Sequence, residues 1–152
     1  MLCSILISNF NKSKYLEECL KSAVNQTYKN IEIIFSDNGS NDNSLKIAEK
    51  FKTVRTLVNT RSTNSPALNQ IDVILKAFEK SSGDFIFFLD SDDFFELDKI
   101  EKIIQYKNTN NFQFIADTPG LYFNENKTKH FKINSIFNFM RSWPIIFPTS
   151  SL

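Results

Sequence analysis

The 152-residue sequence has few of the residues on which several common ligand sites depend. Its three glycines, Gly39, Gly83 and Gly120, lie too far apart for a GxGxxG dinucleotide loop or a Walker A loop. His130 is the one histidine, and both an HExxH zinc motif and a C2H2 zinc finger need two. The sequence therefore excludes these two nucleotide-binding loops and these two zinc motifs.

The chain also lacks an excess of charge of one sign and a long apolar run. Eighteen Lys and Arg against 17 Asp and Glu give a formal net charge of +1, so nothing in the overall charge favours nucleic acid. Cys3 and Cys19 are the only cysteines, and we interpret them as buried free thiols in a reducing compartment. The apolar run 2–7 is too short for a signal sequence or a membrane span, so we expect a cytoplasmic protein.

Short apolar runs alternate with helical stripes along the first two thirds of the chain. Runs of strand-forming residues predict strands at 2–7, 31–35, 54–58 and 85–89. Apolar spacings of three and four predict helices at 14–25, 45–51, 67–80 and 98–108, the third with Ile71, Ile74, Leu75 and Phe78 on one side. Apolar strands that alternate with helices predict a single α/β domain with a mostly parallel sheet covered on both faces.

Two of the predicted helices begin with residues that commonly cap helices. Ser13 is placed to cap the first turn of the helix at 14–25. Asp98 with Glu101 three residues later resembles a capping box at the start of the fourth helix.

The pattern is less regular beyond residue 108. Short strands are predicted at 112–116 and 121–123, about a turn at 117–120. We interpret the basic segment 124–132, which contains His130, as a solvated loop, with phosphate or anionic lipid as an alternative ligand. The apolar segment 136–147 is predicted to pack against further structure, and self-association is expected if that structure is missing.

Polar clusters follow three of the predicted strands. They lie at 8–11, 37–40 and 90–93. Because right-handed crossovers place the carboxyl ends of parallel strands along one rim, and ligands of open α/β sheets bind at that rim, these clusters are expected to face one crevice.

Two of these clusters allow more than one interpretation. Asp90, Asp92 and Asp93 carry three carboxylates within four residues, which suits Mg²⁺ bound together with substrate phosphates. The alternative is a solvated acidic loop without a ligand. Asp37 and Asn38 before Gly39 fit either a plain turn or a pocket that hydrogen-bonds the edge of a nucleobase.

Taken together, these motifs resemble those of family 2 glycosyltransferases with the GT-A fold. The resemblance rests on the order and spacing of Ser8-Asn9-Phe10-Asn11, Tyr15-Leu16, Gln26-Thr27-Tyr28, Glu32-Ile33-Ile34, Asp37-Asn38-Gly39-Ser40-Asn41-Asp42 and the run from Gly83 to Asp93. It is close over 1–108, and it implies a Rossmann-like GT-A domain across 1–152. By this resemblance 1–108 is the nucleotide-sugar-binding part, and 109–152 is the incomplete start of the acceptor side.

The resemblance also implies a function, with a role for each site residue. It implies metal-dependent, inverting transfer of a sugar from a nucleotide diphosphate sugar, with UDP the expected nucleotide, to a glycan or lipid-linked acceptor in polysaccharide biosynthesis. Peripheral association with the inner face of the membrane would suit such an acceptor. The nucleotide-binding residues would be Ser8, Phe10, Asp37, Asn38 and Asp90. Asp92 and Asp93 would hold Mn²⁺ or Mg²⁺.

The sequence departs from the family pattern in four places. Asn38 stands where a second acidic residue is common, Phe10 replaces a frequent Tyr, and Ile74-Leu75 replaces an Arg-Asn pair for which Arg61 or Asn69 could substitute. No catalytic base is identified, and we expect it beyond Leu152, so the chain is expected to be a shortened enzyme. The alternative is a non-catalytic nucleotide-sugar-binding fragment.

Two other classes of protein fit the sequence less well. A phosphoacceptor receiver domain needs acidic residues after the first strand, where this chain has Ser8-Asn9-Phe10. A nucleotidyltransferase needs a loop rich in Gly and Arg at the same place, which this sequence lacks.

Overall fold

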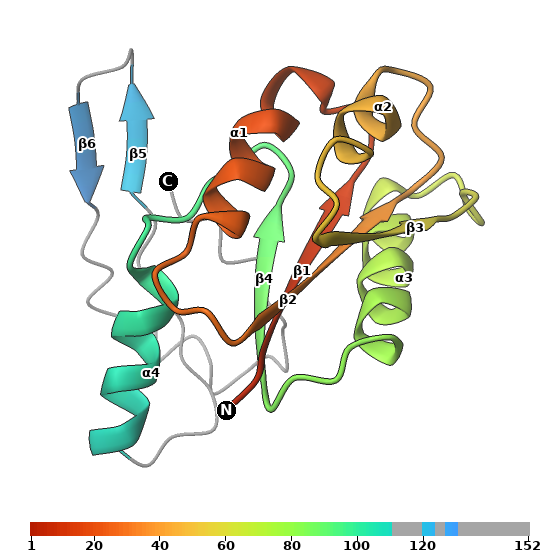
Figure 1. Ribbon diagram of the computed structural model, residues 1–152. Coiled ribbons are helices and arrows are strands. Elements are labelled where there is room, and N and C mark those ends of the chain that lie inside the picture. Colours follow the sequence, from red (N-terminus) through yellow and green to blue (C-terminus); the bar gives the residue numbers. More distant parts are fainter. Residues whose placement is uncertain (111–119, 124–126, 131–152) are drawn as a thin grey trace, which may run out of the picture.

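The computed structural model describes residues 1–110, 120–123 and 127–130, and its main feature is a parallel sheet (Figure 1). The four strands run in the order β3-β2-β1-β4, and every neighbouring pair is parallel. Their bounds are β1 (Cys3–Asn9), β2 (Ile31–Asp37), β3 (Val54–Val58) and β4 (Phe85–Asp90). The helices are α1 (Ser13–Val24), α2 (Ser44–Ala48), α3 (Pro66–Glu79) and α4 (Lys99–Thr109). The predicted α/β fold with a mostly parallel sheet is confirmed.

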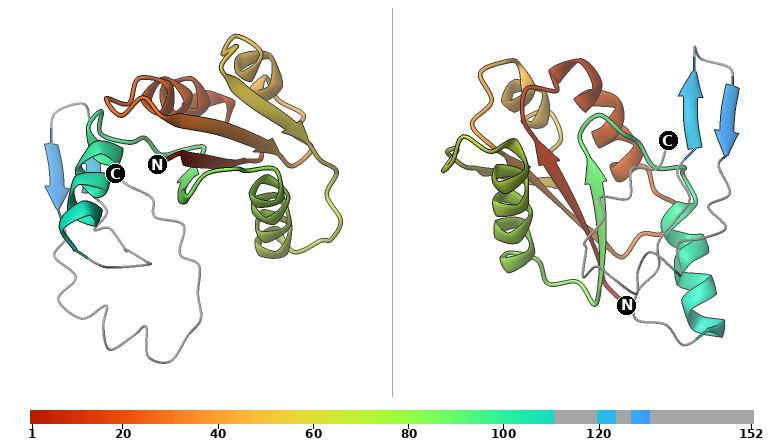
Figure 2. Two further views of the ribbon diagram at one scale, coloured as in Figure 1. Left: turned by 60° about the horizontal axis from the view of Figure 1, so that its bottom comes forward. Right: turned by 180° about the vertical axis from the view of Figure 1, so that it is seen from behind.

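Alternate residues of each strand face opposite sides of the sheet, as strand geometry requires. On one face Ile5 and Ile7 of β1 pack in a core cluster with residues of α1, α2 and α4. On the other face Leu6 of β1 and Ile34 of β2 pack with Ala77 of α3. Figure 2 shows α1 and α2 on one side of the sheet and α3 on the other. Both faces are therefore covered, which explains why β1, β2 and β4 are largely apolar, whereas the edge strand β3 contains the exposed Arg55 and Thr56.

The side of α3 that faces the sheet is not the side with the most apolar residues. Val73 and Ala77 are buried, whereas Ile71, Leu75 and Phe78, which the sequence pattern placed on one apolar side, are each about half exposed. A small residue at 77 lets the helix approach the sheet, so the larger side chains point away from it. The apolar spacing therefore predicted the helix correctly, but it was wrong about which side of the helix is buried.

Neither predicted helix cap forms. Ser13 is the first residue of α1, and its N–H donates to Asp42 Oδ2 (2.9 Å) from the loop after β2. At α4, Asp98 occupies the cap position without a side-chain capping bond, and Glu101 instead accepts a hydrogen bond from the Thr27 hydroxyl (2.6 Å). The sequence predicted capping hydrogen bonds within each helix, but the hydrogen bonds that form join residues far apart in the sequence.

The segment after α4 differs in one respect from the expected arrangement. β5 (Gly120–Phe123) pairs with β6 (Lys127–His130) in a two-stranded antiparallel sheet. The strand at 121–123 is confirmed, but 127–130 is not the loop that its basic composition suggested, because pairing with β5 satisfies its backbone. The predicted strand at 112–116 and the apolar segment 136–147 lie outside the described residues.

Both cysteines are buried free thiols, as expected. Burial raises the pKa of the Cys3 thiol to about 11 and that of Cys19 still further. Neither thiol is therefore a thiolate at neutral pH. Among the helices of the described residues, none has both the length and the apolar character that crossing a membrane requires.

Asp42 is expected to contribute to stability because it ties the loop after β2 to the start of α1. It accepts hydrogen bonds from the N–H groups of Ser13 and Ser44, both at 2.9 Å. Burial alone would raise its pKa, but these bonds, together with the nearby hydroxyls of the two serines, lower it to about 2. Asp42→Ala should lower the free energy of unfolding by about 1–2 kcal/mol at pH 7.

The pH dependence of this effect follows from the lowered pKa. The folded state favours the charged carboxylate, so its contribution is fully present above the ordinary pKa of about 4 and is lost as the pH falls toward 2. Urea unfolding of both proteins at pH 7, 4 and 3 measures this, with Asn41→Ala in the same loop as the control. A difference that stays constant down to pH 3 would contradict the role of the charge.

Candidate functional site

A cavity of about 370 Å³ opens at the carboxyl ends of the strands. Ser8 and Phe10 line it from the end of β1, Asn38 from the end of β2, and Asp90 and Asp92 from the end of β4. The structure thus brings five sequence-predicted site residues from three strand ends to one hollow. The topology explains this convergence, because β1 lies between β2 and β4 and all three strands point the same way.

α3 and the loop before it close the opposite side of the cavity. Pro66, Gln70 and Val73 line it from successive turns of the helix, and Arg61 lines it from the loop. The spacing of four and three puts these helix residues on one face. Gln70 was not predicted from the sequence, because the apolar pattern of α3 pointed to Ile71, Leu75 and Phe78 and not to the side with the buried Val73.

Asp90 is held in place by two donors. The Ser8 hydroxyl (3.1 Å) and Gln70 Nε2 (3.0 Å) both donate to Asp90 Oδ1. Burial raises the pKa of Asp90 above its ordinary value, the Ser8 bond opposes that rise, and the nearby Asp92 carboxylate adds to it. β1, α3 and β4 therefore fix one carboxylate oxygen of Asp90 at the floor of the cavity.

Asp92 and Asp93 face different surroundings. Asp92 is 39% exposed, lines the cavity and pairs with the ammonium group of Lys12, whose pKa this bond raises. Asp93 is 9% exposed and is not among the lining residues. Burial, with the charges of Asp90 and Asp92, raises the pKa of Asp93 to about 6. Of the two residues expected at a metal, Asp92 is the one that the cavity exposes.

Asp37 and Asn38 are neighbours in sequence with different surroundings. Asp37 is fully buried and accepts hydrogen bonds from Asn9 Nδ2 (2.7 Å), the Ser40 hydroxyl (2.6 Å) and the Ser40 N–H (2.8 Å). Gly39 follows with φ of +73°, a conformation that glycine adopts without strain. Asn38 lines the cavity, 4% exposed, and its Oδ1 is buried without a hydrogen-bond partner within the described residues. Asp37 therefore braces the loop, and Asn38 presents a polar group to the cavity.

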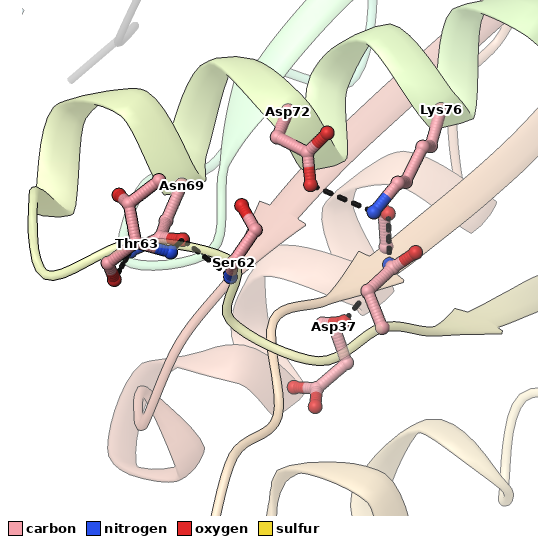
Figure 3. Close-up of polar contacts among 8 residues, drawn as sticks. Asp37, Ser62, Thr63, Asn69, Asp72 and Lys76 are labelled. Carbon is pink, nitrogen blue, oxygen red and sulfur yellow. Dashed lines mark hydrogen bonds and ion pairs between the residues drawn. The ribbon is translucent and has the colours of Figure 1, made fainter.

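The outer wall of the cavity is an aromatic ring covered by a cation. The Arg61 guanidinium lies 4.4 Å from the centre of the Phe10 ring, within cation–π range. Asn69 of α3 holds the loop that follows Arg61: its Oδ1 accepts from the N–H groups of Ser62 (3.0 Å) and Thr63 (3.1 Å), contacts drawn in Figure 3. Asn69 does not line the cavity, so of the two substitutes considered for the family's Arg-Asn pair only Arg61 reaches it.

The donor groups at Asp90 and Asp92 fit a divalent cation that takes part of its coordination from a ligand. The described residues hold no group of three or more His, Cys, Asp or Glu side chains that could bind a metal by themselves. Mg²⁺ commonly uses one or two carboxylates, several waters and the phosphates of a substrate, and Asp92 at the cavity mouth suits that role. Lys12, which the sequence analysis did not single out, is the cation that Asp92 pairs with in this structure.

The chemistry of the cavity suits an anionic ligand with a flat ring at one end. Phe10 and Arg61 offer a stacking surface, and Asn38 offers a carboxamide for the edge of the ring. Lys12 and the Asp92 carboxylate, the latter through a cation, could meet a diphosphate at the other end.

Sequence comparisons identify the family. The model of the family described as "Glycosyl transferase family 2" matches residues 4–150. An uncharacterized glycosyltransferase of Haemophilus influenzae is 37% identical over 125 residues, which is 80% of this chain and 47% of that protein. A cholesterol galactosyltransferase of Borreliella burgdorferi is 31% identical over 120 residues, 79% of this chain and 33% of that protein. The chain thus spans half or less of the length of these two relatives.

Solved structures agree with the fold. S. aureus TarS 1-349 in complex with UDP-GlcNAc superposes with a TM-score of 0.61 and 26% identity, over 72% of this chain and 32% of that one. The uncomplexed TarS 1-349 gives a TM-score of 0.60 at 24% identity. The predicted GT-A architecture is therefore confirmed, and the chain belongs to glycosyltransferase family 2.

Proposed function

We propose that this chain forms the donor site of a glycosyltransferase that uses a UDP-sugar and a divalent metal and inverts the anomeric centre. Nucleotide-sugar binding is supported by the family match and by the UDP-GlcNAc complex of TarS. The observation that carries the proposal is the single cavity into which Phe10, Asn38 and Asp92 converge from three strand ends.

The cavity suggests how a nucleotide sugar would lie. The base would stack on an outer face of the Phe10–Arg61 pair, because the 4.4 Å between them leaves no room for a ring, and its edge would meet the Asn38 carboxamide. The ribose would lie near the Asp90 carboxylate, which Ser8 and Gln70 hold in one orientation. Asp37 supports this arrangement through the loop, because its own oxygens are already bonded to Asn9 and Ser40.

Asp92 is the residue proposed to hold Mn²⁺ or Mg²⁺, with Asp93 behind it. The chemistry that a bound cation supplies here is stabilisation of negative charge on the leaving nucleoside diphosphate. Lys12 already faces the same carboxylate, so the protein provides a positive charge at this place before any metal binds. Asp93 would act through its effect on local charge, since it does not line the cavity.

Transfer would be a single displacement. An acceptor hydroxyl oxygen forms the new bond to the anomeric carbon while the bond to the diphosphate breaks, and a base removes the hydroxyl proton. The only carboxylates that line the cavity in the described residues are Asp90 and Asp92, and both have donor-side roles. The base is therefore proposed to lie outside the described residues, as are the acceptor contacts of the 109–152 part.

The acceptor is proposed to be a glycan or a lipid-linked sugar. A cytoplasmic enzyme acting near the inner membrane face would meet both a UDP-sugar and such an acceptor. A non-catalytic donor-binding fragment remains the second candidate, favoured by the absence of a spare carboxylate among the residues described at the cavity. Formation of glycosylated product from a purified acceptor distinguishes the two.

Calorimetric titration of nucleoside diphosphates tests the donor site directly. UDP is expected to bind in the presence of Mn²⁺ and to bind at least about tenfold more weakly after the metal is removed by chelation, because a metal bridging to the diphosphate contributes to affinity. Absence of UDP binding with and without Mn²⁺ would refute the proposed function.

A further inference from the structure

The loop after β2 contains a polar group without a hydrogen-bond partner at the base end of the cavity. Asn38 is 4% exposed, and its Oδ1 has no hydrogen-bond partner within the described residues. Its backbone is fixed, because its N–H donates to the Asn9 carbonyl (2.9 Å). A buried amide oxygen without a donor is costly, so a ligand that supplies a donor here gains affinity.

The neighbouring acidic residue cannot take over this role. Both oxygens of Asp37 already accept hydrogen bonds from Asn9 and Ser40, and its side chain is fully buried. Reading the base edge with Asp37 would require breaking these bonds and opening the loop. The group that meets the base is therefore a neutral carboxamide and not a carboxylate.

The two groups differ in what they can recognise. A carboxamide has one acceptor and two donor hydrogens on adjacent atoms, whereas an ionised carboxylate only accepts. Uracil presents an N–H donor beside a carbonyl acceptor, and cytosine presents a ring nitrogen acceptor beside an amino donor. Exchanging the positions of Oδ1 and Nδ2 by rotation of the side chain matches the carboxamide to either edge. A carboxylate has no donor, so it forms one hydrogen bond with either base and its second oxygen faces a lone pair, that of a uracil carbonyl or of the cytosine ring nitrogen.

The remaining contacts with the base do not distinguish uracil from cytosine. Stacking on Phe10 and coverage by Arg61 depend on the face of the ring, which uracil and cytosine share. Asn38 Oδ1 accepts no hydrogen bond within the described residues that would hold the carboxamide in one of its two orientations. The Asn38 side chain can therefore adopt either of the two orientations, which exchange Oδ1 and Nδ2.

We propose that Asn38 makes the donor site accept cytidine as well as uridine diphosphates, an inference that rests on the proposed function. CDP should bind within about tenfold of UDP in the presence of Mn²⁺, since the same pair of hydrogen bonds forms with either base. Asn38→Asp should weaken the binding of both UDP and CDP by about 10–100-fold, because a carboxylate cannot donate to the acceptor on either base edge, and a bidentate base contact typically contributes this much.

Calorimetric titration of UDP and CDP at pH 8, where an introduced aspartate is ionised, provides the test. Asn41→Asp is the matched control, because it adds the same charge to the exposed part of the same loop. It should leave both affinities unchanged. Thermal melts establish that each variant is folded, and the wild-type ratio tests the proposal without any variant.

The outcomes separate this inference from the function on which it rests. If wild-type protein binds UDP but prefers it to CDP by more than about tenfold, the inference fails and the proposed donor site is unaffected. Unchanged affinities for both nucleotides in folded Asn38→Asp would also overturn it. If neither nucleotide binds, the proposed function itself is wrong.

Discussion

Asp92→Ala is expected to abolish the dependence of UDP binding on Mn²⁺, lowering the affinity in the presence of metal by about 10–100-fold. Asp92 is the exposed carboxylate at the cavity mouth, whereas Asp90 is bonded to Ser8 and Gln70 and Asp93 lies behind the surface. Without Asp92 the cation would keep only the phosphates and water. Affinity measured after chelation should change little.

Lys12→Met is expected to raise the affinity for Mn²⁺, whereas Asp92→Ala is expected to weaken metal-dependent binding. The ammonium group of Lys12 pairs with Asp92 in this structure, so a divalent cation must displace it to bind there. Removing it should raise the affinity for Mn²⁺ alone by about two- to fivefold, the range expected for a partly exposed ion pair. Electron paramagnetic resonance of free Mn²⁺ measures this without nucleotide and without turnover.

The control for Asp92→Ala is Asp72→Ala, and the control for Lys12→Met is Lys76→Met. Asp72 forms a similar ion pair with Lys76 (2.7 Å), is 35% exposed and lies away from the cavity lining on α3 (Figure 3). Each control removes the same charge as the variant that it matches, so its binding of Mn²⁺ and UDP should equal that of the wild type. Equal stimulation by Mn²⁺ in Asp92→Ala and wild-type protein would place the cation elsewhere.

The sequence was sufficient for the sheet because its signals are local. Apolar runs and helical stripes in 1–108 predicted each of the strands and helices found there, and topology rules placed three polar strand ends together. The prediction that Phe10, Asp37 and Asp92 meet at one cavity needed only strand order and direction. Phe10 and Asp92 line the cavity, but Asp37 is buried and its neighbour Asn38 lines the cavity in its place. The family resemblance, confirmed by the match over 4–150, supplied the chemistry.

What the sequence could not decide depends on contacts between distant residues. Whether Asp37 or Asn38 faces the cavity depends on the turn at Gly39 and on bonds from Asn9, 28 residues before Asp37. Gln70 reaches Asp90 because α3 packs against the sheet through Val73 and Ala77, and not through its larger apolar residues. Composition likewise could not show that the basic residues 127–130 pair with β5.

Gly83→Ala is expected to have the largest effect on stability. Gly83 lies just before β4, and its N–H donates to Ser4 Oγ (2.9 Å). A Cβ at this position would lie 2.7 Å from the Ser4 backbone nitrogen, and still closer to the Ser4 hydroxyl. Ser4 is fully buried and its hydroxyl donates to Glu32 Oε1 (2.6 Å), so one methyl group would disturb three strands at once.

The free energy of unfolding should fall by about 3 kcal/mol, because overpacking and a broken buried hydrogen bond add together. Urea unfolding followed by circular dichroism measures the loss. Ser82→Ala is the control, since residue 82 is exposed and keeps the N–H that donates to Glu32, and it should change stability by no more than about 0.5 kcal/mol.

A double-mutant cycle with Ser4→Ala tests whether the clash is the cause. Ser4→Ala removes the hydroxyl that the new methyl group would meet first, but not the backbone nitrogen. The double variant should therefore lose less stability than the sum of the two single losses, by about 1 kcal/mol. Additive losses, or a Gly83→Ala protein as stable as the wild type, would show that the start of β4 can move away from β1. In that case the close approach of the two strands would not explain why glycine is needed here.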